Sequence, residues 1–101
     1  MNKYIEPFLE EMAKQVGFNI LAISGGRICF RETGITLPVG KGYFVEIDLM
    51  PSDTYCVKRV WQTKSKRIVK GVVDDVYSEE LGEIAYQASC FVNVSFGGDI
   101  K

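Results

Sequence analysis

The sequence of 101 residues contains no histidine. This absence removes the commonest general base near neutral pH, the commonest metal ligand and every nucleophile pair built on histidine. An enzyme without histidine needs a carboxylate or a lysine whose pKa is shifted by burial, and no pattern in the sequence marks such a group. We therefore expect a protein that is not an enzyme and that uses neither a cofactor nor a metal.

Cysteines are also few, and Cys29, Cys56 and Cys90 are widely spaced, with no C-x-x-C pair among them. This spacing suits neither a disulfide framework nor a zinc site, so we expect three buried, reduced thiols. No apolar run follows a basic flank at the N-terminus, and no segment approaches the length of a membrane span. These absences predict a cytoplasmic protein without a membrane partner.

The composition is that of an ordered globular protein, with 47% apolar and 25% charged residues. The formal net charge of -1 argues against a protein that coats duplex DNA over its whole surface. The length corresponds to one domain, residues 1–101.

Two segments have the periodicity of amphipathic helices. The first is predicted over Met1–Val16, with regular helix from about Glu6 and a stop at Gly17. The second begins at Ser78, a helix-capping residue type that is followed by glutamates in the first turn. Its apolar stripe consists of Leu81, Ile84, Ala85 and Ala88. A glycine inside this helix, Gly82, indicates a close approach to the sheet.

Between the helices the apolar pattern changes to the alternation of β-strands. Phe18–Ser24 and Arg27–Thr33 flank Gly25-Gly26, which tolerates the backbone of a tight turn, so we predict a hairpin here. Gly34–Gly42, rich in glycine, is predicted to be an irregular connection. Tyr43–Leu49 is predicted to be a strand with its odd-numbered side chains turned inward.

The segment 58–70 holds six of the twelve basic side chains and the only tryptophan, and no acidic residue occurs from 54 to 73. We predict a hairpin of strands Thr54–Trp61 and Lys66–Val73, in which Trp61 faces Lys66 and Arg59 faces Ile68. Neither face is cleanly apolar towards the tip, so the tip should project beyond the core.

These elements predict an α+β fold: an N-terminal helix, a five-stranded antiparallel β-meander and a C-terminal helix, with both helices on one face of the sheet. Residues 90–96 fit either a continued helix or a sixth strand, and we prefer the strand. The other face of the sheet is left for solvent, a ligand or a second copy of the chain.

Two functions suit this architecture. The first is a small protein-binding module (an adaptor, inhibitor or immunity-type protein, with a homodimer as one form) that uses the exposed sheet face and the 58–70 hairpin. The second is nucleic-acid binding by the same basic hairpin, with an aromatic side chain stacked on an unpaired base. The lysines also fit a solvated hairpin that resists aggregation. The predicted binding residues are Tyr55, Arg59, Trp61, Lys64, Lys66 and Arg67.

The acidic C-terminal helix and the basic hairpin have opposite charge. Glu79, Glu80 and Glu83 lie on the predicted outer face of that helix. Because opposite charges attract across an interface, one copy of the chain can also dock on another.

Overall fold

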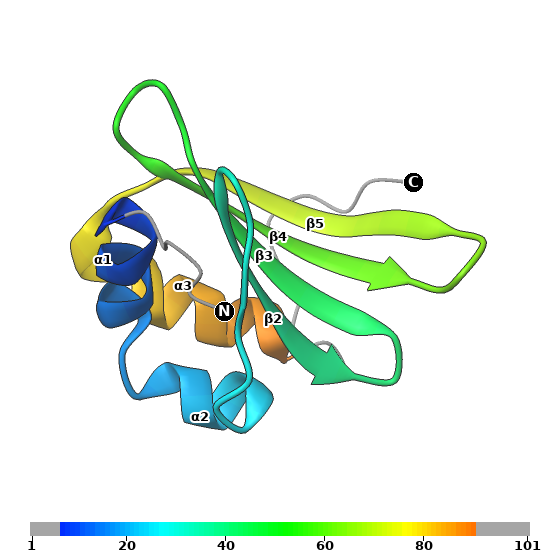
Figure 1. Cartoon of the computed structure of the whole chain (residues 1–101). Helices are drawn as coiled ribbons and strands as arrows, with labels where there is room; N and C mark the ends of the chain where they lie inside the picture. Colours follow the sequence, from blue (N-terminus) through cyan, green and yellow to red (C-terminus); the bar gives the residue numbers. More distant parts are fainter. Residues whose placement is uncertain (1–6, 91–101) are drawn as a thin grey trace, which may run out of the picture.

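The structure is a computed structural model that describes residues 7–90, and it consists of a helical layer packed on an antiparallel sheet (Figure 1). The helices are α1 (Pro7–Val16), α2 (Asn19–Ser24) and α3 (Leu81–Ser89), and a short 3-10 helix, η1 (Ser78–Glu80), precedes α3. The strands are β1 (Cys29–Phe30), β2 (Gly34–Gly40), β3 (Tyr43–Leu49), β4 (Tyr55–Gln62) and β5 (Arg67–Val76). They form one antiparallel sheet in sequence order. The predicted α+β class and five-stranded meander are confirmed.

The core lies between the helices and one face of the sheet, as predicted (Figure 1). Its fully buried members include Met12 from α1, Ile35, Leu37, Val45, Ile47 and Val57 from the sheet, and Leu81 and Ala85 from α3. Removing apolar surface from water in this way stabilises the fold by about 25 cal/mol per Å². Within residues 7–90, no helix covers the opposite face of the sheet.

The first helix ends where the sequence predicts. Leu9, Met12 and Val16 of α1 face the core. Gly17 has a φ of 63°, and its N–H donates a hydrogen bond of 3.0 Å to the carbonyl of Ala13. A residue without Cβ adopts this left-handed conformation at little cost, so the helix stops there.

The predicted first hairpin is wrong, because residues 19–24 form the helix α2. Gly25 takes the left-handed conformation of a helix end, and its N–H donates to the carbonyl of Leu21 at 2.9 Å. The pair Gly25-Gly26 therefore ends a helix and does not turn a hairpin. A short apolar run fits both periodicities, and here packing of Ile23 into the core selects the helix.

The predicted irregular connection at residues 34–42 is also wrong, because Gly34–Gly40 is the strand β2. Ile35 and Leu37 are fully buried, and β2 pairs with both β1 and β3. Pro38 fits because β1 pairs only with residues 35 and 36, so Pro38 lies beyond the end of β1, where no strand needs its missing N–H.

The strand β3 agrees with the prediction, and Val45 and Ile47 are buried on the helix side.

The register predicted for the basic hairpin is wrong by two residues or more. Trp61 pairs with Ile68, and Arg59 pairs with Gly71. The cause is a later turn, closed by a bond of 2.8 Å from the Thr63 N–H to the Lys66 carbonyl, and irregularities further along β4 and β5.

The close approach at Gly82 exists, but it is to α1 and α2 and not to the sheet. A Cβ at residue 82 would lie 2.8 Å from the side-chain nitrogen of Asn19 and 3.1 Å from the carbonyl oxygen of Val16. Gly82 therefore lets α3 pack against the junction of the two N-terminal helices. The predicted stripe is otherwise observed, since Leu81, Ala85 and Ala88 are buried.

Two further predictions concern the ends of the chain and the membrane. The predicted strand over residues 90–96 falls almost entirely outside the described residues. Within residues 7–90, none of the helices has the length and apolar character needed to cross a bilayer.

Candidate interaction surfaces

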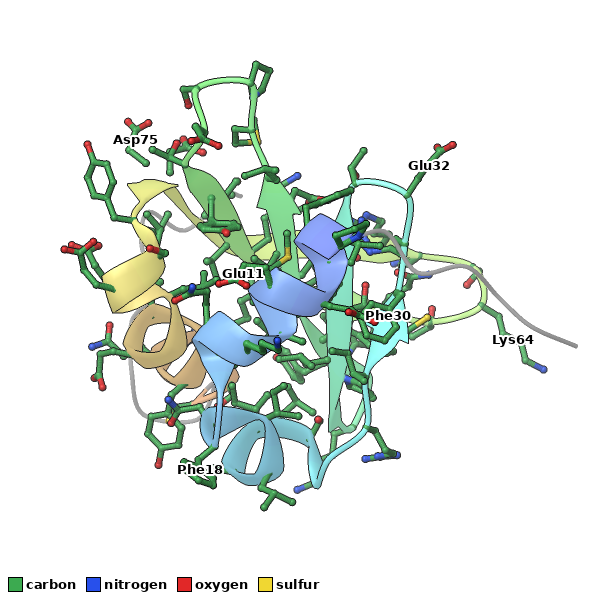
Figure 2. All side chains as sticks on the ribbon, turned by 60° about the vertical axis from the view of Figure 1, so that its left-hand side comes forward. Glu11, Phe18, Phe30, Glu32, Lys64 and Asp75 are labelled. Carbon is green, nitrogen blue, oxygen red and sulfur yellow. The ribbon has the colours of Figure 1, made fainter. Side chains whose placement is uncertain are left out.

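The tip of the β4–β5 hairpin, defined here as residues 61–68, extends away from the body of the protein (Figure 1). Its turn is fixed locally: the hydroxyl oxygen of Thr63 accepts a hydrogen bond from the Lys66 N–H at 3.2 Å. Lys64 and Lys66 are exposed, and Figure 2 shows Lys64 pointing into solvent. Neither lysine forms an ion pair within the described part of the chain.

Arg67 starts β5 and makes a bidentate ion pair with Glu46 of β3. The Nη1–Oε2 distance is 2.6 Å and the Nη2–Oε1 distance is 2.8 Å. These hydrogen bonds hold the pKa of Glu46 below its ordinary value and raise that of Arg67. The guanidinium is thus already neutralised, although Arg67 is exposed.

Arg59 is 6% exposed and faces the helices. Its Nε donates to the carbonyl of Ala88 at 2.8 Å, and its Nη2 donates to the carbonyls of Gln87 and Cys90 at 3.1 and 3.2 Å. A cation at this position donates to carbonyls at the C-terminal end of α3, of which that of Gln87 also accepts the Cys90 N–H at 3.1 Å, and it complements the negative end of the helix dipole. The structure thus places Arg59 inside the fold, away from the hairpin surface.

The two predicted aromatic binding residues lie at opposite ends of β4. Trp61 is half-buried against the β2–β3 turn, where a Cβ at Gly42 would lie 2.9 Å from its Nε1. Tyr55 is half-buried against the core, and burial, followed by the charges of Glu11 and Asp53, raises its pKa. Six residues of strand separate them by roughly 20 Å. The six predicted binding residues therefore do not form one site, and only Trp61, Lys64, Lys66 and Arg67 gather at the tip.

The helix-free face of the sheet carries charged groups that pair with one another. Arg31 donates from Nη1 to Asp48 Oδ1 at 3.0 Å and from Nε to Thr36 Oγ1 at 2.7 Å. The Glu46–Arg67 pair lies on the same face, because Glu46 and Asp48 are two residues apart in β3 and side chains two apart in a strand point to the same side. The surface is therefore mixed in character, and the carboxylates of Glu46 and Asp48 are already paired with arginines.

An exposed apolar surface that the sequence analysis did not predict lies around α2. Phe18 is 93% exposed and Leu21 is 66% exposed, and Figure 2 shows Phe18 at the outer edge of the helical layer. Gly82 of α3 packs against Asn19 of α2. Tyr86 is also exposed and lies one helical turn after Gly82 on the same side of α3, so it borders α2. The signal was present in the sequence: residues 15–26 contain no charge, and residues 18, 21 and 22 have helical spacing.

Three exposed glutamates lie at the start of α3, the helix that packs against α2. Glu79 and Glu80 belong to η1, and Glu83 belongs to the first turn of α3. None of the three forms an ion pair with a residue in the range 7–90. We call the surface formed by Phe18, Leu21, Tyr86, Glu79, Glu80 and Glu83 the α2–α3 face.

The cysteines and the acidic side chains are the remaining candidates for a reactive thiol or a metal site. Cys56 is buried, and burial, with a contribution from Asp74, raises the pKa of its thiol to about 11. Cys29 is exposed, which corrects the prediction that all three thiols are buried. Among residues 7–90, no group of three or more candidate side chains is arranged to hold a metal ion.

Comparisons with known proteins do not add a relative to these observations. The chain matches no protein-family model, no curated protein and no solved structure.

Proposed function

We propose that this protein is a small protein-binding module without enzymatic activity, and that the α2–α3 face is its principal contact surface. The observation that carries the proposal is the exposure of Phe18 and Leu21 on the outer side of a helix that has no charged residue. Single exposed apolar residues are common, but neighbouring ones bordered by polar groups are typical of interaction sites. Burying these two side chains against a partner stabilises a complex by roughly 1.5–3 kcal/mol each.

The titratable groups support a role without catalysis. A general base or nucleophile that works near neutral pH needs a pKa moved towards 7. The shifts in residues 7–90 run the other way: the pKa of Glu46 is lowered, and those of Tyr55, Cys56 and Arg67 are raised.

The hairpin tip and the helix-free sheet face are secondary contact surfaces in this proposal. The tip presents Lys64 and Lys66 beside Trp61 and Ile68, a combination of charge and apolar surface that suits a protein partner. Nucleic-acid binding by the hairpin is the competing interpretation. It has less support, because Arg59 is buried under α3 and Arg67 is paired with Glu46, which leaves two free cations at the turn.

A photo-crosslinking amino acid placed at position 18 tests the proposal in the cells that naturally make the protein. We expect crosslinks from position 18 to a protein of defined mass, and their loss when Leu21→Ser is added, because contact then loses its second apolar group. The matched control is position 32, since Glu32 is exposed in the β1–β2 turn, away from α2 (Figure 2). Crosslinks that form equally from both positions, or none from position 18, would contradict the proposal.

A further inference from the structure

We propose that the α2–α3 face of one copy binds the hairpin tip of a second copy, so that copies associate head to tail. This inference rests on the proposed function, because it names the partner of the same surface.

The two surfaces are complementary in charge. The α2–α3 face carries Glu79, Glu80 and Glu83 as exposed carboxylates, and the tip carries Lys64 and Lys66 as exposed ammonium groups. Within residues 7–90, none of the five is neutralised by an ion pair. Opposite fields of this kind steer two surfaces together and fix their relative orientation.

The two surfaces also match in apolar content. The tip brings Ile68, which is 37% exposed, and the half-buried ring of Trp61. These groups can cover Phe18 and Leu21, while the lysines turn towards the glutamates at the start of α3. An apolar centre with a charged rim is the usual arrangement of a protein interface.

The positions of the two surfaces require a second molecule. The tip projects from one end of the sheet, whereas α2 and the start of α3 lie on the other side of the molecule (Figure 1). Lys64 and Phe18 are accordingly far apart on opposite sides of Figure 2. One copy therefore cannot place its own tip on its own α2–α3 face.

The charges also favour a head-to-tail contact over a two-fold one. A symmetric contact between two α2–α3 faces would bring two sets of three glutamates together, and like charges facing each other are destabilising. A contact between different surfaces avoids this repulsion. Because such a contact need not close on itself, it produces assemblies whose size grows with concentration.

Sedimentation equilibrium of the full chain, with two charge-reversal variants, tests the inference. The face variant combines Glu79→Lys, Glu80→Lys and Glu83→Lys; the tip variant combines Lys64→Glu and Lys66→Glu. We expect the wild type to show a mass that rises with protein concentration at about 10 mM salt, where charges act over about 30 Å, and that is lower at the same protein concentration in about 1 M salt. Each variant alone should stay monomeric, because its two surfaces have the same sign.

The decisive result is the equimolar mixture of the two variants. The basic face of one then meets the acidic tip of the other, so association should return. Phe18→Ser added to both variants should weaken the mixed association about tenfold, the effect of losing one buried apolar group from each contact. Glu32→Lys, a charge reversal outside both surfaces, should leave the wild-type masses unchanged, and circular dichroism confirms that each variant is folded.

A wild type that remains monomeric throughout, or variants that fail to associate when mixed, would overturn the inference. Its failure can be separated from that of the proposed function. A monomeric protein that still crosslinks from position 18 to another protein refutes self-association and keeps the binding module, whereas a monomer without any such crosslink ends both proposals.

Discussion

Replacing Arg59 with methionine is expected to destabilise the fold by about 3 kcal/mol. The guanidinium makes three hydrogen bonds of 2.8–3.2 Å to carbonyls at the end of α3, and the residue is 6% exposed. Methionine is an unbranched chain that fills most of the same space, so the loss is one of hydrogen bonding and not of packing. The acceptors are backbone carbonyls, which no substitution removes; all three lose the guanidinium, and that of Gln87 keeps the Cys90 N–H.

The magnitude follows from two opposing terms. Hydrogen bonds to a charged group contribute about 1.5–3 kcal/mol each, so three of them would give more than 4 kcal/mol. Removing the charge also removes the cost of keeping it away from water, and carbonyls at a helix end recover some bonds to water. A net loss of about 3 kcal/mol corresponds to a decrease in Tm of roughly 12–24 °C for a chain of this size.

Urea unfolding followed by circular dichroism measures this loss, provided that the slope with denaturant stays that of the wild type. Arg67→Met is the matched control, because it removes an arginine whose ion pair lies at the surface and is expected to cost about 1 kcal/mol or less. If Arg59→Met costs no more than Arg67→Met, then Arg59 does not fix the end of α3 and the reasoning is refuted.

Two further changes test contacts of the sheet. Gly34→Ala should destabilise the protein by more than about 3 kcal/mol, since its Cβ would lie 1.9 Å from the carbonyl oxygen of Ile47. The control is Gly25→Ala at the end of α2, where no atom lies within 4 Å of the added Cβ, so the loss should be only about 1 kcal/mol despite the positive φ. Equal losses of unfolding free energy in urea would contradict this account. Glu46→Gln should flatten the acid dependence of stability: because the folded pKa of Glu46 is lowered, the unfolded chain binds its proton first, and the stabilisation, present above the ordinary glutamate pKa, is lost as pH falls through the folded value. The free energy of unfolding, measured with urea from about pH 7 to pH 3, should therefore fall by about 1 kcal/mol less in the variant, and parallel profiles would refute the assignment.

The sequence predicts the regular parts of the fold because their patterns are long enough to be unambiguous. The stripe of α1, its stop at Gly17 and the alternation of β3 each extend over a sufficient number of residues to distinguish a period of 3.6 from one of 2. Residues 18–24 give only one or two turns, and both periods fit them. Tertiary packing of Ile23 and the left-handed Gly25 then decide in favour of helix, which local preference cannot show.

The strand β2 was missed for a different physical reason. Glycine and proline normally interrupt strands, yet here each meets a particular requirement of the sheet. Gly34 lies where a Cβ would collide with the backbone of β3, and Pro38 lies beyond the end of β1. Both requirements arise from neighbouring strands, so they become visible only when the pairing is known.

The candidate site shows the same dependence on the folded context. Counting charges along the sequence treats the six basic residues of the hairpin as equivalent, but arginine and lysine have different roles in this fold. Arg59 and Arg67, with their planar groups of several donors, are used inside the molecule, one on carbonyls of α3 and one on Glu46. The lysines at the turn form no ion pair with any residue in the range 7–90.

This division determines what kind of contact the hairpin can make. Free ammonium groups on flexible stems at an exposed turn act through long-range attraction, which salt screens and which mainly affects the rate of association. They contribute little to affinity once they are paired at an exposed rim. The larger contribution to affinity has to come from apolar surface. Among residues 7–90, Phe18 and Leu21 are the most exposed of the large apolar side chains, and Phe18 lies far from Lys64 of the tip (Figure 2). In the proposed head-to-tail contact, the basic tip supplies charge and the α2–α3 face of a second copy supplies the apolar surface that the tip lacks.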